Sequence, residues 1–146
     1  LHTNGYSLAR NVLLSRFKIN DYIEDLECTV SESLLSVHKS YLSILDGILE
    51  KKWLNGVAHI TGGGIVSNTK RVIDDKQDLF IDWNGWPRPE IFKLIQNLGN
   101  VPEEDMRKTM NLGIGMVLIV DPLGYEECIS HLNLLNEVYY KLGNII

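Results

Sequence analysis

The chain has 146 residues, a mass of 16.6 kDa and a net charge of −5, from 14 Lys and Arg against 19 Asp and Glu. Its 45% hydrophobic and 23% charged residues are typical of a soluble globular domain, and they exclude disorder, collagen, coiled coils and membrane spans. The acidic balance argues against nucleic acid as a partner, while a local site can still bind a small anion.

The cysteines and the first residue of the chain indicate its cellular location and its domain organisation. Cys28 and Cys128 are a hundred residues apart and show no CxxC or Cys/His spacing. We therefore expect reduced thiols, no metal ligands and a cytoplasmic location. The sequence opens at Leu1 without an initiator methionine, so we expect residues 1–146 to be one domain of a longer chain.

Apolar periodicity predicts a mixture of helices and short strands in the first half of the chain. One apolar face predicts a helix over residues 6–17, and the polar stretch 18–29 is expected to be irregular. A second amphipathic pattern predicts a helix over 37–51. A β-prone run predicts a strand at 57–60, which stops at three glycines before a short helix over 65–72.

The next segments continue this alternation. A short apolar run predicts a strand at 79–81, ended by a turn over 82–87. A proline in the first turn and a glycine just past the end predict a helix bounded by Pro89 and Gly99. Asn100 as N-cap then predicts the next helix, which should reach Met110.

The last third completes an α+β pattern. Residues 115–120 are almost wholly apolar, which predicts a central strand covered on both faces. A helix over 125–135 and a last strand over 138–142 follow. Four strands among about five helices predict a sheet with helices packed over its faces.

Three consecutive glycines at residues 62–64 are the most informative feature. They end the run Ala-His-Ile-Thr-Gly-Gly-Gly at 58–64, between a predicted strand and a predicted helix. Without Cβ atoms, the backbone can approach a ligand closely and turn its N–H groups toward an anion such as phosphate. A P-loop and a dinucleotide GxGxxG are both absent. A tight turn without a ligand is the alternative interpretation.

His59 lies inside the predicted strand and has two interpretations. It is either a core or edge histidine with satisfied hydrogen bonds, or a donor or proton shuttle beside a ligand. The residue pattern alone favours the first interpretation.

Two further polar segments flank predicted helices. His2, Asn4 and Gly5 crowd before the first helix, where Asn4 or Ser7 fits an N-cap and Gly5 a turn. The same groups could hold an anion at the start of that helix. Asn111 follows a later helix and is a candidate for substrate contact.

Other conspicuous residues have simple structural interpretations. Trp83 and Trp86 are expected to pack at a loop corner, because no basic surface accompanies them. The acidic residues 103–105 are expected to form a solvated helix start, and Gly115 a kink at a strand entry. Spacing alone assembles no nucleophile, base and orienting group.

Six ordered blocks resemble the C-terminal half of the phosphoribosylformylglycinamidine cyclo-ligase, or AIR synthetase, family. The family patterns are Gly-Leu-His-Ser-Asn-Gly-Tyr-Ser-Leu, Ala-His-Ile-Thr-Gly-Gly-Gly, Asn-Ile-Pro-Arg-Val, Trp-x-x-Pro-x-Ile-Phe, Leu-Gly-Asn-Val and Arg-Thr-Phe-Asn-Met-Gly-Ile-Gly-Met. They correspond to residues 1–8, 58–64, 68–72, 86–92, 98–101 and 108–116. The resemblance covers nearly the whole chain.

The resemblance implies a fold and a partner domain. The implied fold has three α/β/α layers around a mixed sheet of about four strands, with partly ferredoxin-like topology. It packs against an N-terminal domain that forms a homodimer and holds most of the ATP and Mg²⁺ contacts. The site would lie in the cleft between the two domains.

The implied activity is an ATP-dependent ring closure in de novo purine biosynthesis. ATP activates the amide oxygen of formylglycinamidine ribonucleotide as a phosphate ester, and an internal nitrogen displaces it to give aminoimidazole ribonucleotide, ADP and phosphate. Such chemistry needs positioning and neutralisation of phosphate charge. Neither nucleic acid nor a membrane is an expected partner.

The resemblance also implies which residues lie near the ligand. His2 and His59 are the catalytic candidates, and no metal ligand is expected in this half. The residues expected near substrate or phosphate are His2, Asn4, Gly5, His59, Thr61, Gly62, Gly63 and Gly64, to which the polar loop adds Asn111.

Some positions depart from the family pattern. The family usually has Pro-Thr-Arg-Ile-Tyr where this chain has Val-His-Lys-Ser-Tyr at 37–41, so Lys39 keeps the charge of that Arg without its bidentate fork. Thr69 and Lys70 replace Ile-Pro. The N-terminal motifs Asp-Gly-Val-Gly-Thr-Lys and Asp-x4-Gly-Ala-x-Pro are absent, so the fragment alone is expected to be inactive.

Two alternatives to the cyclo-ligase stay open. One is the corresponding domain of a related ATP-dependent enzyme, such as formylglycinamidine synthetase, selenophosphate synthetase or thiamine-phosphate kinase. The other is a non-catalytic ligand-binding module that uses the same glycine loop.

Overall fold

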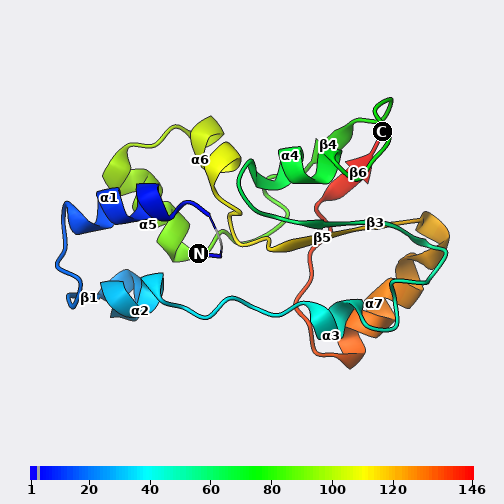
Figure 1. Cartoon of the computed structure of the whole chain (residues 1–146), viewed down its shortest axis with the longest axis horizontal. Coiled ribbons are helices and arrows are strands. Elements are labelled where there is room, and N and C mark those ends of the chain that lie inside the picture. Colours follow the sequence, from blue (N-terminus) through cyan, green and yellow to red (C-terminus); the bar gives the residue numbers. More distant parts are fainter. Residues whose placement is uncertain (3) are drawn as a thin grey trace.

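The computed structural model describes residues 1–2 and 4–146, so Thr3 of the first polar segment lies outside the described residues. Helices and short strands alternate along the chain, as the apolar pattern predicts (Figure 1). The α-helices are α1 (Tyr6–Leu14), α2 (Val30–Leu34), α3 (Leu42–Leu45), α4 (Gly64–Lys70), α5 (Glu90–Gly99), α6 (Glu103–Thr109) and α7 (Tyr125–Leu134). The strands are β1 (Tyr22–Ile23), β2 (Cys28–Thr29), β3 (Leu54–His59), β4 (Leu79–Ile81), β5 (Met116–Val120) and β6 (Gly143–Ile145). Two 3₁₀ turns are η1 (Glu24–Leu26) and η2 (Pro122–Gly124).

The strands form three separate antiparallel pairs, β1 with β2, β3 with β5, and β4 with β6. The expected four-stranded mixed sheet between two helical layers, with its ferredoxin-like topology, is therefore wrong for the described residues. Each residue of β5 is only half-buried, which also contradicts the central strand covered on both faces. A two-stranded ribbon is only marginally stable by itself, so these pairs depend on the helices packed around them.

The expected helix over 37–51 is also wrong. Only α3 is helical there, and the preceding segment crosses the molecule in an extended form between α2 and α3 (Figure 1). The apolar residues at helical spacing are divided between two cores, because Leu34 packs in one cluster and Ile44 in the other. Val37 is 93% exposed, so the periodicity of this segment does not reflect one buried face.

Smaller differences concern the ends of elements. The first helix begins at Tyr6 as predicted and ends at Leu14. Residues 18–29, expected to be irregular, contain the β1–β2 pair. The last strand is β6 rather than 138–142, and it pairs with β4 through Phe80 opposite Asn144. The predicted segments 65–72, 79–81 and 125–135 match α4, β4 and α7 to within two residues at each end, and β3 begins three residues before the predicted 57–60.

The junction between α5 and α6 differs from the expected caps. Gly99 is the last residue of α5, and Asn100 adopts a left-handed conformation with φ of 46°. A Cβ at Gly99 would lie 2.7 Å from Cγ2 of Val12, so this glycine permits the close packing of α5 on α1. Asn100 thus ends α5, and α6 begins after Pro102.

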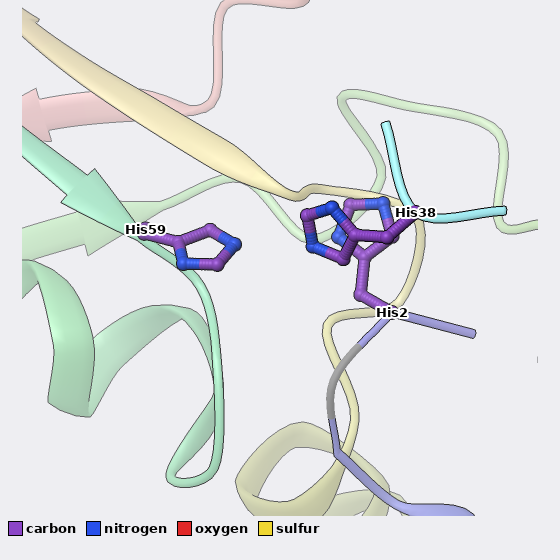
Figure 2. Close-up of side chains that lie close together, drawn as sticks. All are labelled: His2, His38 and His59. Carbon is purple, nitrogen blue, oxygen red and sulfur yellow. The ribbon is translucent and has the colours of Figure 1, made fainter. Parts of the chain in front are cut away.

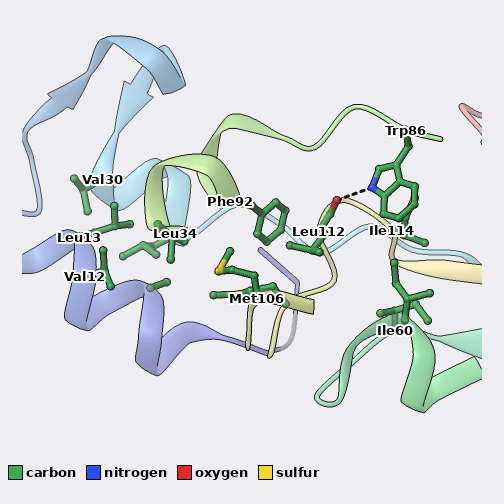
Figure 3. Packing of buried hydrophobic residues seen from close by; sticks show 14 of the residues in the cluster. Val12, Leu13, Val30, Leu34, Ile60, Trp86, Phe92, Met106, Leu112 and Ile114 are labelled. Carbon is green, nitrogen blue, oxygen red and sulfur yellow. Dashed lines mark hydrogen bonds between the residues drawn. The ribbon is translucent and has the colours of Figure 1, made fainter. Parts of the chain in front are cut away.

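The main core gathers α1, α2, α5 and α6 around the loop that precedes β5 (Figure 3). Its fully buried side chains include Leu13, Ile60, Ile95, Met106 and Leu112. At about 25 cal/mol per Å² of apolar surface, burying each such side chain stabilises the fold by roughly 1.5 to 3 kcal/mol. This core holds the first polar segment, the glycine loop and the end of α6 in one place.

A second, smaller core joins α3 to α7. It consists of Ile44, Cys128 and Leu132, with Tyr41 and Trp53 packed against it. Both cysteines are free thiols. Among the described residues, no helix is long and apolar enough to cross a membrane.

Candidate functional site

The glycine loop connects β3 to α4, as the sequence predicts. Gly63 and Gly64 both have left-handed backbones, with φ of 98° and 68°. The amide N–H groups of Gly62 and Gly63 donate to no acceptor among the described residues. A Cβ at Gly62 would meet no atom within 4 Å, so its backbone faces open space. The loop therefore offers two free donors on an accessible surface.

Asn68 fixes the shape of this loop from within. Its buried amide group donates to the carbonyl oxygens of Thr61 at 3.3 Å, Gly62 at 3.2 Å and Gly64 at 2.7 Å. The Thr61 hydroxyl donates to Asn68 Oδ1 at 3.2 Å. Because the carbonyls are held inward, the loop does not need a ligand to keep its conformation. Sequence reasoning missed this role, although Asn68 begins one of the six blocks and lies one helical turn after Gly64.

The glycines also permit close packing. A Cβ at Gly64 would collide with the carbonyl oxygen of Arg107, so α4 approaches α6 at this point. A Cβ at Gly63 would lie 2.9 Å from Ser67 Oγ. Two of the three glycines thus have structural reasons to be present, independent of any ligand.

A groove of about 490 Å³ lies beside the glycine loop, between α4 and α6. Three cations, Lys70, Arg107 and Lys108, line it together with one acid, Glu104. The rest of its lining is Gly63, Val66, Ser67 and Trp83. Each cation pairs with a carboxylate, since Lys70 lies 2.9 Å from Asp78, Arg107 2.8 Å from Glu103, and Lys108 3.8 Å from Glu104. The pairs of both lysines are largely exposed, so an anionic ligand can compete for them.

A larger hollow of about 840 Å³ lies elsewhere, near η1 and the start of α5. Its rim carries Glu24, Asp25, Glu27, Glu32 and Glu90. This accumulation of negative charge opposes phosphate binding. The smaller groove is therefore the better candidate for an anion site.

The first polar segment attaches to the end of α6. The Asn4 side chain donates to the Thr109 carbonyl oxygen. Gly5 is the N-cap of α1 with φ of 79°, and a Cβ there would collide with Met110. The expectation that Asn4 or Ser7 caps α1 is wrong, because α1 has no side-chain cap. Asn4 instead links this segment to α6.

Three histidines from distant parts of the sequence meet beside this segment (Figure 2). The ring centroids are 4.2 Å apart for His2 and His38 and 5.4 Å apart for His38 and His59. Tyr41 lies against all three rings, and its hydroxyl is 3.4 Å from His2 Nε2. We call His2, His38 and His59 the histidine cluster. His59 is exposed at the end of β3, a strand of a two-stranded pair, so it is an edge histidine and not a core one.

Burial and charge keep His2 neutral. Desolvation, followed by the influence of His38, lowers the pKa of His2 to about 4. Burial also raises the pKa of Tyr41, with a further contribution from Glu137. Both groups are therefore uncharged at neutral pH.

Gly115 makes room for the histidine cluster. A Cβ at this position would collide with the Tyr41 hydroxyl and with the His2 ring, whose Nδ1 would be 2.7 Å away. Gly115 precedes β5, and its carbonyl oxygen accepts from Ile60 N at 2.9 Å. The sequence pattern predicts that Gly115 forms a kink at the strand entry. In the structure, its lack of a side chain also leaves the space that His2 and Tyr41 occupy.

Asn111 shows a structural role. It is buried, and its Oδ1 accepts from Gly113 N at 3.2 Å, which closes the loop before β5. Leu112 in this loop has φ of 52°, and its carbonyl accepts from Trp86 Nε1 at 2.9 Å (Figure 3). Trp86 is thus a buried packing residue, as predicted.

Glu103 is more than the solvated start of a helix. It accepts two hydrogen bonds from Arg88, at 2.6 and 2.9 Å, one from Gln96 at 2.9 Å and one from Arg107 at 2.8 Å. The Arg88 hydrogen bonds are the largest reason why the pKa of Glu103 falls to about 2. The guanidinium of Arg107 also lies 4.2 Å from the centre of the Trp83 ring. This network ties α6 to α5 and to the segment that precedes α5.

Comparison with known proteins connects these features to one family. The sequence model of the family described as "AIR synthase related protein, C-terminal domain" matches residues 1–146. The chain belongs to this family. The AIR synthase resemblance drawn from the six sequence blocks is confirmed.

Similar proteins carry one name. A phosphoribosylformylglycinamidine cyclo-ligase of Pseudothermotoga lettingae is 40% identical over 146 residues, which is 100% of this chain and 43% of the relative. That of Geotalea daltonii is 42% identical over 147 residues, covering 99% of the chain and 42% of the relative. That of Thermoanaerobacter sp. strain X514 is 38% identical over 148 residues, which is 100% of this chain and 44% of the relative.

The AIR synthase domain described here therefore spans less than half the length of these relatives, at 42 to 44%. The relatives' activity belongs to longer polypeptides. What this domain contributes to such an activity has to be argued from its own residues.

Proposed function

We propose that this domain is the C-terminal half of an ATP-dependent phosphoribosylformylglycinamidine cyclo-ligase. Together with an N-terminal domain, in a homodimer, it would close the imidazole ring of formylglycinamidine ribonucleotide in purine biosynthesis. The main support is that relatives bearing this name are 38 to 42% identical over at least 99% of the chain. A cytoplasmic location fits this role.

The glycine loop supports a role in holding phosphate. The free N–H groups of Gly62 and Gly63 can donate to phosphoryl oxygens, and Lys70 and Lys108 can neutralise charge from the adjacent groove. The helix dipole contributes little, since α4 has only seven residues. Preformed donors that need no reorganisation stabilise charge that develops during transfer.

The histidines supply proton-transfer groups. Ring closure requires the attacking nitrogen to lose a proton while phosphate departs from the activated carbon. His59 is accessible at the end of β3, so its imidazole can accept that proton, whereas the lowered pKa of His2 makes His2 a poor proton acceptor. Asn111 is turned toward its own loop, and we assign it to positioning this loop rather than to substrate contact.

Mg²⁺ does not fit the described residues. Magnesium prefers oxygen ligands in octahedral geometry, and the only cluster of three ligating side chains in the described part of the chain consists of imidazoles. Glu103 and Glu104 are engaged with Arg and Lys. We therefore assign Mg²⁺ and most of the ATP contacts to the N-terminal domain.

The decisive test joins this domain to the N-terminal half of the Pseudothermotoga lettingae relative in one polypeptide. We expect ATP-dependent formation of aminoimidazole ribonucleotide with release of one ADP per product. The relative's own two halves, joined in the same way, are the positive control. A folded chimera that binds ATP but forms no product would contradict the proposal.

The isolated domain gives a second test. Because only part of the nucleotide site is present, we expect no ATP binding with micromolar affinity in calorimetric titration. Micromolar affinity for ATP in the domain alone would favour an independent ligand-binding module.

A further inference from the structure

We propose that His2, His38 and His59 form a binding site for a divalent transition-metal ion such as Zn²⁺. One ring nitrogen from each histidine lies within 4.8 Å of one from each of the others. The rings come from the first residues of the chain, the extended segment before α3 and the end of β3 (Figure 2). This inference depends on the three imidazoles and not on the proposed ligase activity.

Unpaired nitrogens in the histidine cluster supply an independent reason for a ligand. His2 Nδ1 and His38 Nε2 are buried and have no hydrogen-bond partner among the described residues. If His2 Nε2 carries its proton toward the Tyr41 hydroxyl, its Nδ1 presents a bare lone pair. Buried polar atoms without partners are costly, and a metal ion would satisfy both nitrogens.

The donor set selects the class of metal. Three neutral imidazoles suit Zn²⁺, Cu²⁺, Ni²⁺ or Co²⁺, whereas Mg²⁺ and Ca²⁺ require oxygen ligands. Three histidines leave the fourth tetrahedral position for water or another ligand. Tetrahedral zinc with bonds of about 2.0 to 2.1 Å places its nitrogens about 3.4 Å apart. Reaching that separation requires changes in the side-chain torsions of the cluster, and those of exposed His59 are the least restricted by packing.

The surroundings of the histidine cluster match those of a metal site. Tyr41 can orient the His2 ring from the side away from the metal, as outer-shell partners do. Lys39, the nearby cation, forms an ion pair with Glu137, which reduces its repulsion of a metal ion. The exposure of His59 provides access from solvent.

The sequence gives no hint of this site. Positions 2, 38 and 59 match no metal-ligand spacing, and no metal ligand is expected from them.

The experiment titrates the metal-free chain with Zn²⁺ by calorimetry and with Co²⁺ by visible absorption. Residues are added ahead of Leu1, so that a free α-amino group next to His2 does not coordinate the metal. We expect one ion per chain and the strong visible bands of four-coordinate Co²⁺. His38→Ala should weaken Zn²⁺ binding at least about 100-fold, since it removes a ligand rather than an outer-shell partner.

His131→Ala is the matched control. His131 is the fourth histidine of the chain and contacts the Ile44 carbonyl oxygen at 2.9 Å, away from the histidine cluster. This variant should bind Zn²⁺ as the parent does. If His38→Ala fails to fold, His59→Gln replaces it, because an exposed side chain at a strand end is not needed for packing.

Three results would overturn the proposal. The first is the absence of stoichiometric binding to the metal-free chain. The second is Zn²⁺ affinity unchanged by His38→Ala and His59→Gln. The third is an equal loss of affinity in His131→Ala, which would show that binding does not depend on the histidine cluster. None of these readouts involves catalysis, so their failure leaves the proposed function untouched, whereas confirmed binding would mean that the coordinating nitrogens of His2 and His59 cannot accept the ring-closure proton while the metal is bound.

Discussion

The glycine loop and the histidine cluster are both attached to the end of β3, yet they are built in opposite ways. In the glycine loop, Asn68 satisfies three carbonyl groups and α6 packs directly against Gly64. In the histidine cluster, two buried nitrogens have no partner within the described part of the chain. The carbonyl groups of the glycine loop are satisfied within the fold, whereas the two histidine nitrogens would be satisfied by a bound ion.

This contrast separates structural glycines from functional ones. Gly64 is required because the Arg107 backbone leaves no room for a Cβ, and Gly5 is favoured by its left-handed backbone, with φ of 79°. A Cβ at Gly62 would meet no neighbouring atom, so packing does not explain this glycine and ligand binding is the remaining role that the variants test. The four variants below test the contrast, beginning with the largest expected effect.

The largest effect is expected for Gly64→Ala. The new Cβ would meet the Arg107 carbonyl and also require an unfavourable left-handed backbone, with φ of 68°. We expect a loss of about 3 kcal/mol or more in the free energy of unfolding, measured by urea denaturation. Gly47→Ala is the control, because Gly47 has φ of 80° with no atom within 4 Å of a Cβ, and it should lose only about 1 kcal/mol. Equal losses would mean that the contact with α6 is not tight.

Gly115→Ala should disrupt the histidine cluster without straining the backbone. Its Cβ would displace His2 and Tyr41, while the φ of Gly115 lies outside the left-handed region. We expect Zn²⁺ affinity to fall by about 10- to 100-fold, comparable with the loss of an outer-shell partner. Gly62→Ala, measured in the same titration, should keep the parent affinity. Unchanged affinity in Gly115→Ala would show that His2 can bind metal from another position.

Glu103 is expected to make stability depend on acidity. Its pKa is lowered to about 2 in the folded chain, from an ordinary 4.5. The stabilisation is therefore complete above about pH 5 and is lost as the pH falls from about 4.5 to 2. Its side chain is 37% exposed, so after solvent screening we expect about 1 to 2 kcal/mol, measured by denaturation at each pH.

Glu103→Gln should flatten this pH dependence and lower stability at pH 7 by the same amount. The control is Glu104→Gln, whose exposed carboxylate lies 3.8 Å from Lys108 and should change stability by less than about 0.5 kcal/mol. If Glu103→Gln loses as much stability between about pH 5 and pH 2 as the parent does, other carboxylates cause the pH dependence.

The smallest effect on stability is expected for Gly62→Ala. Because the new methyl group meets no atom and the backbone is not left-handed, unfolding should change by less than about 0.5 kcal/mol. Activity of the chimeric enzyme should nevertheless fall about tenfold, since the methyl group crowds the two free N–H groups. A substitution at Gly62 is a better test than one at Gly63. At Gly63, the contact with Ser67 and the φ of 98° would destabilise the variant, so lost stability could not be separated from lost binding. Full activity in a stable Gly62→Ala variant would remove the glycine loop from the site.

The sequence alone predicts the α+β class, the strand-to-helix turn at the glycines, the start of the first helix at Tyr6 and the position of α7. These features depend on local periodicity and on residues with restricted or permissive backbones, which act over a few positions. The six family blocks also come from sequence alone, and the family match over residues 1–146 confirms them.

Only the tertiary structure decided the pairing of strands, the division of the 37–51 segment and the meeting of His2, His38 and His59. The same apolar pattern can face one core as a helix or two cores with an extended link, and periodicity does not distinguish them. The contacts of Asn68, Glu103 and Gly115 likewise depend on what a folded neighbour presents. Long-range packing determines these contacts, because their energy comes from partners that are distant in sequence.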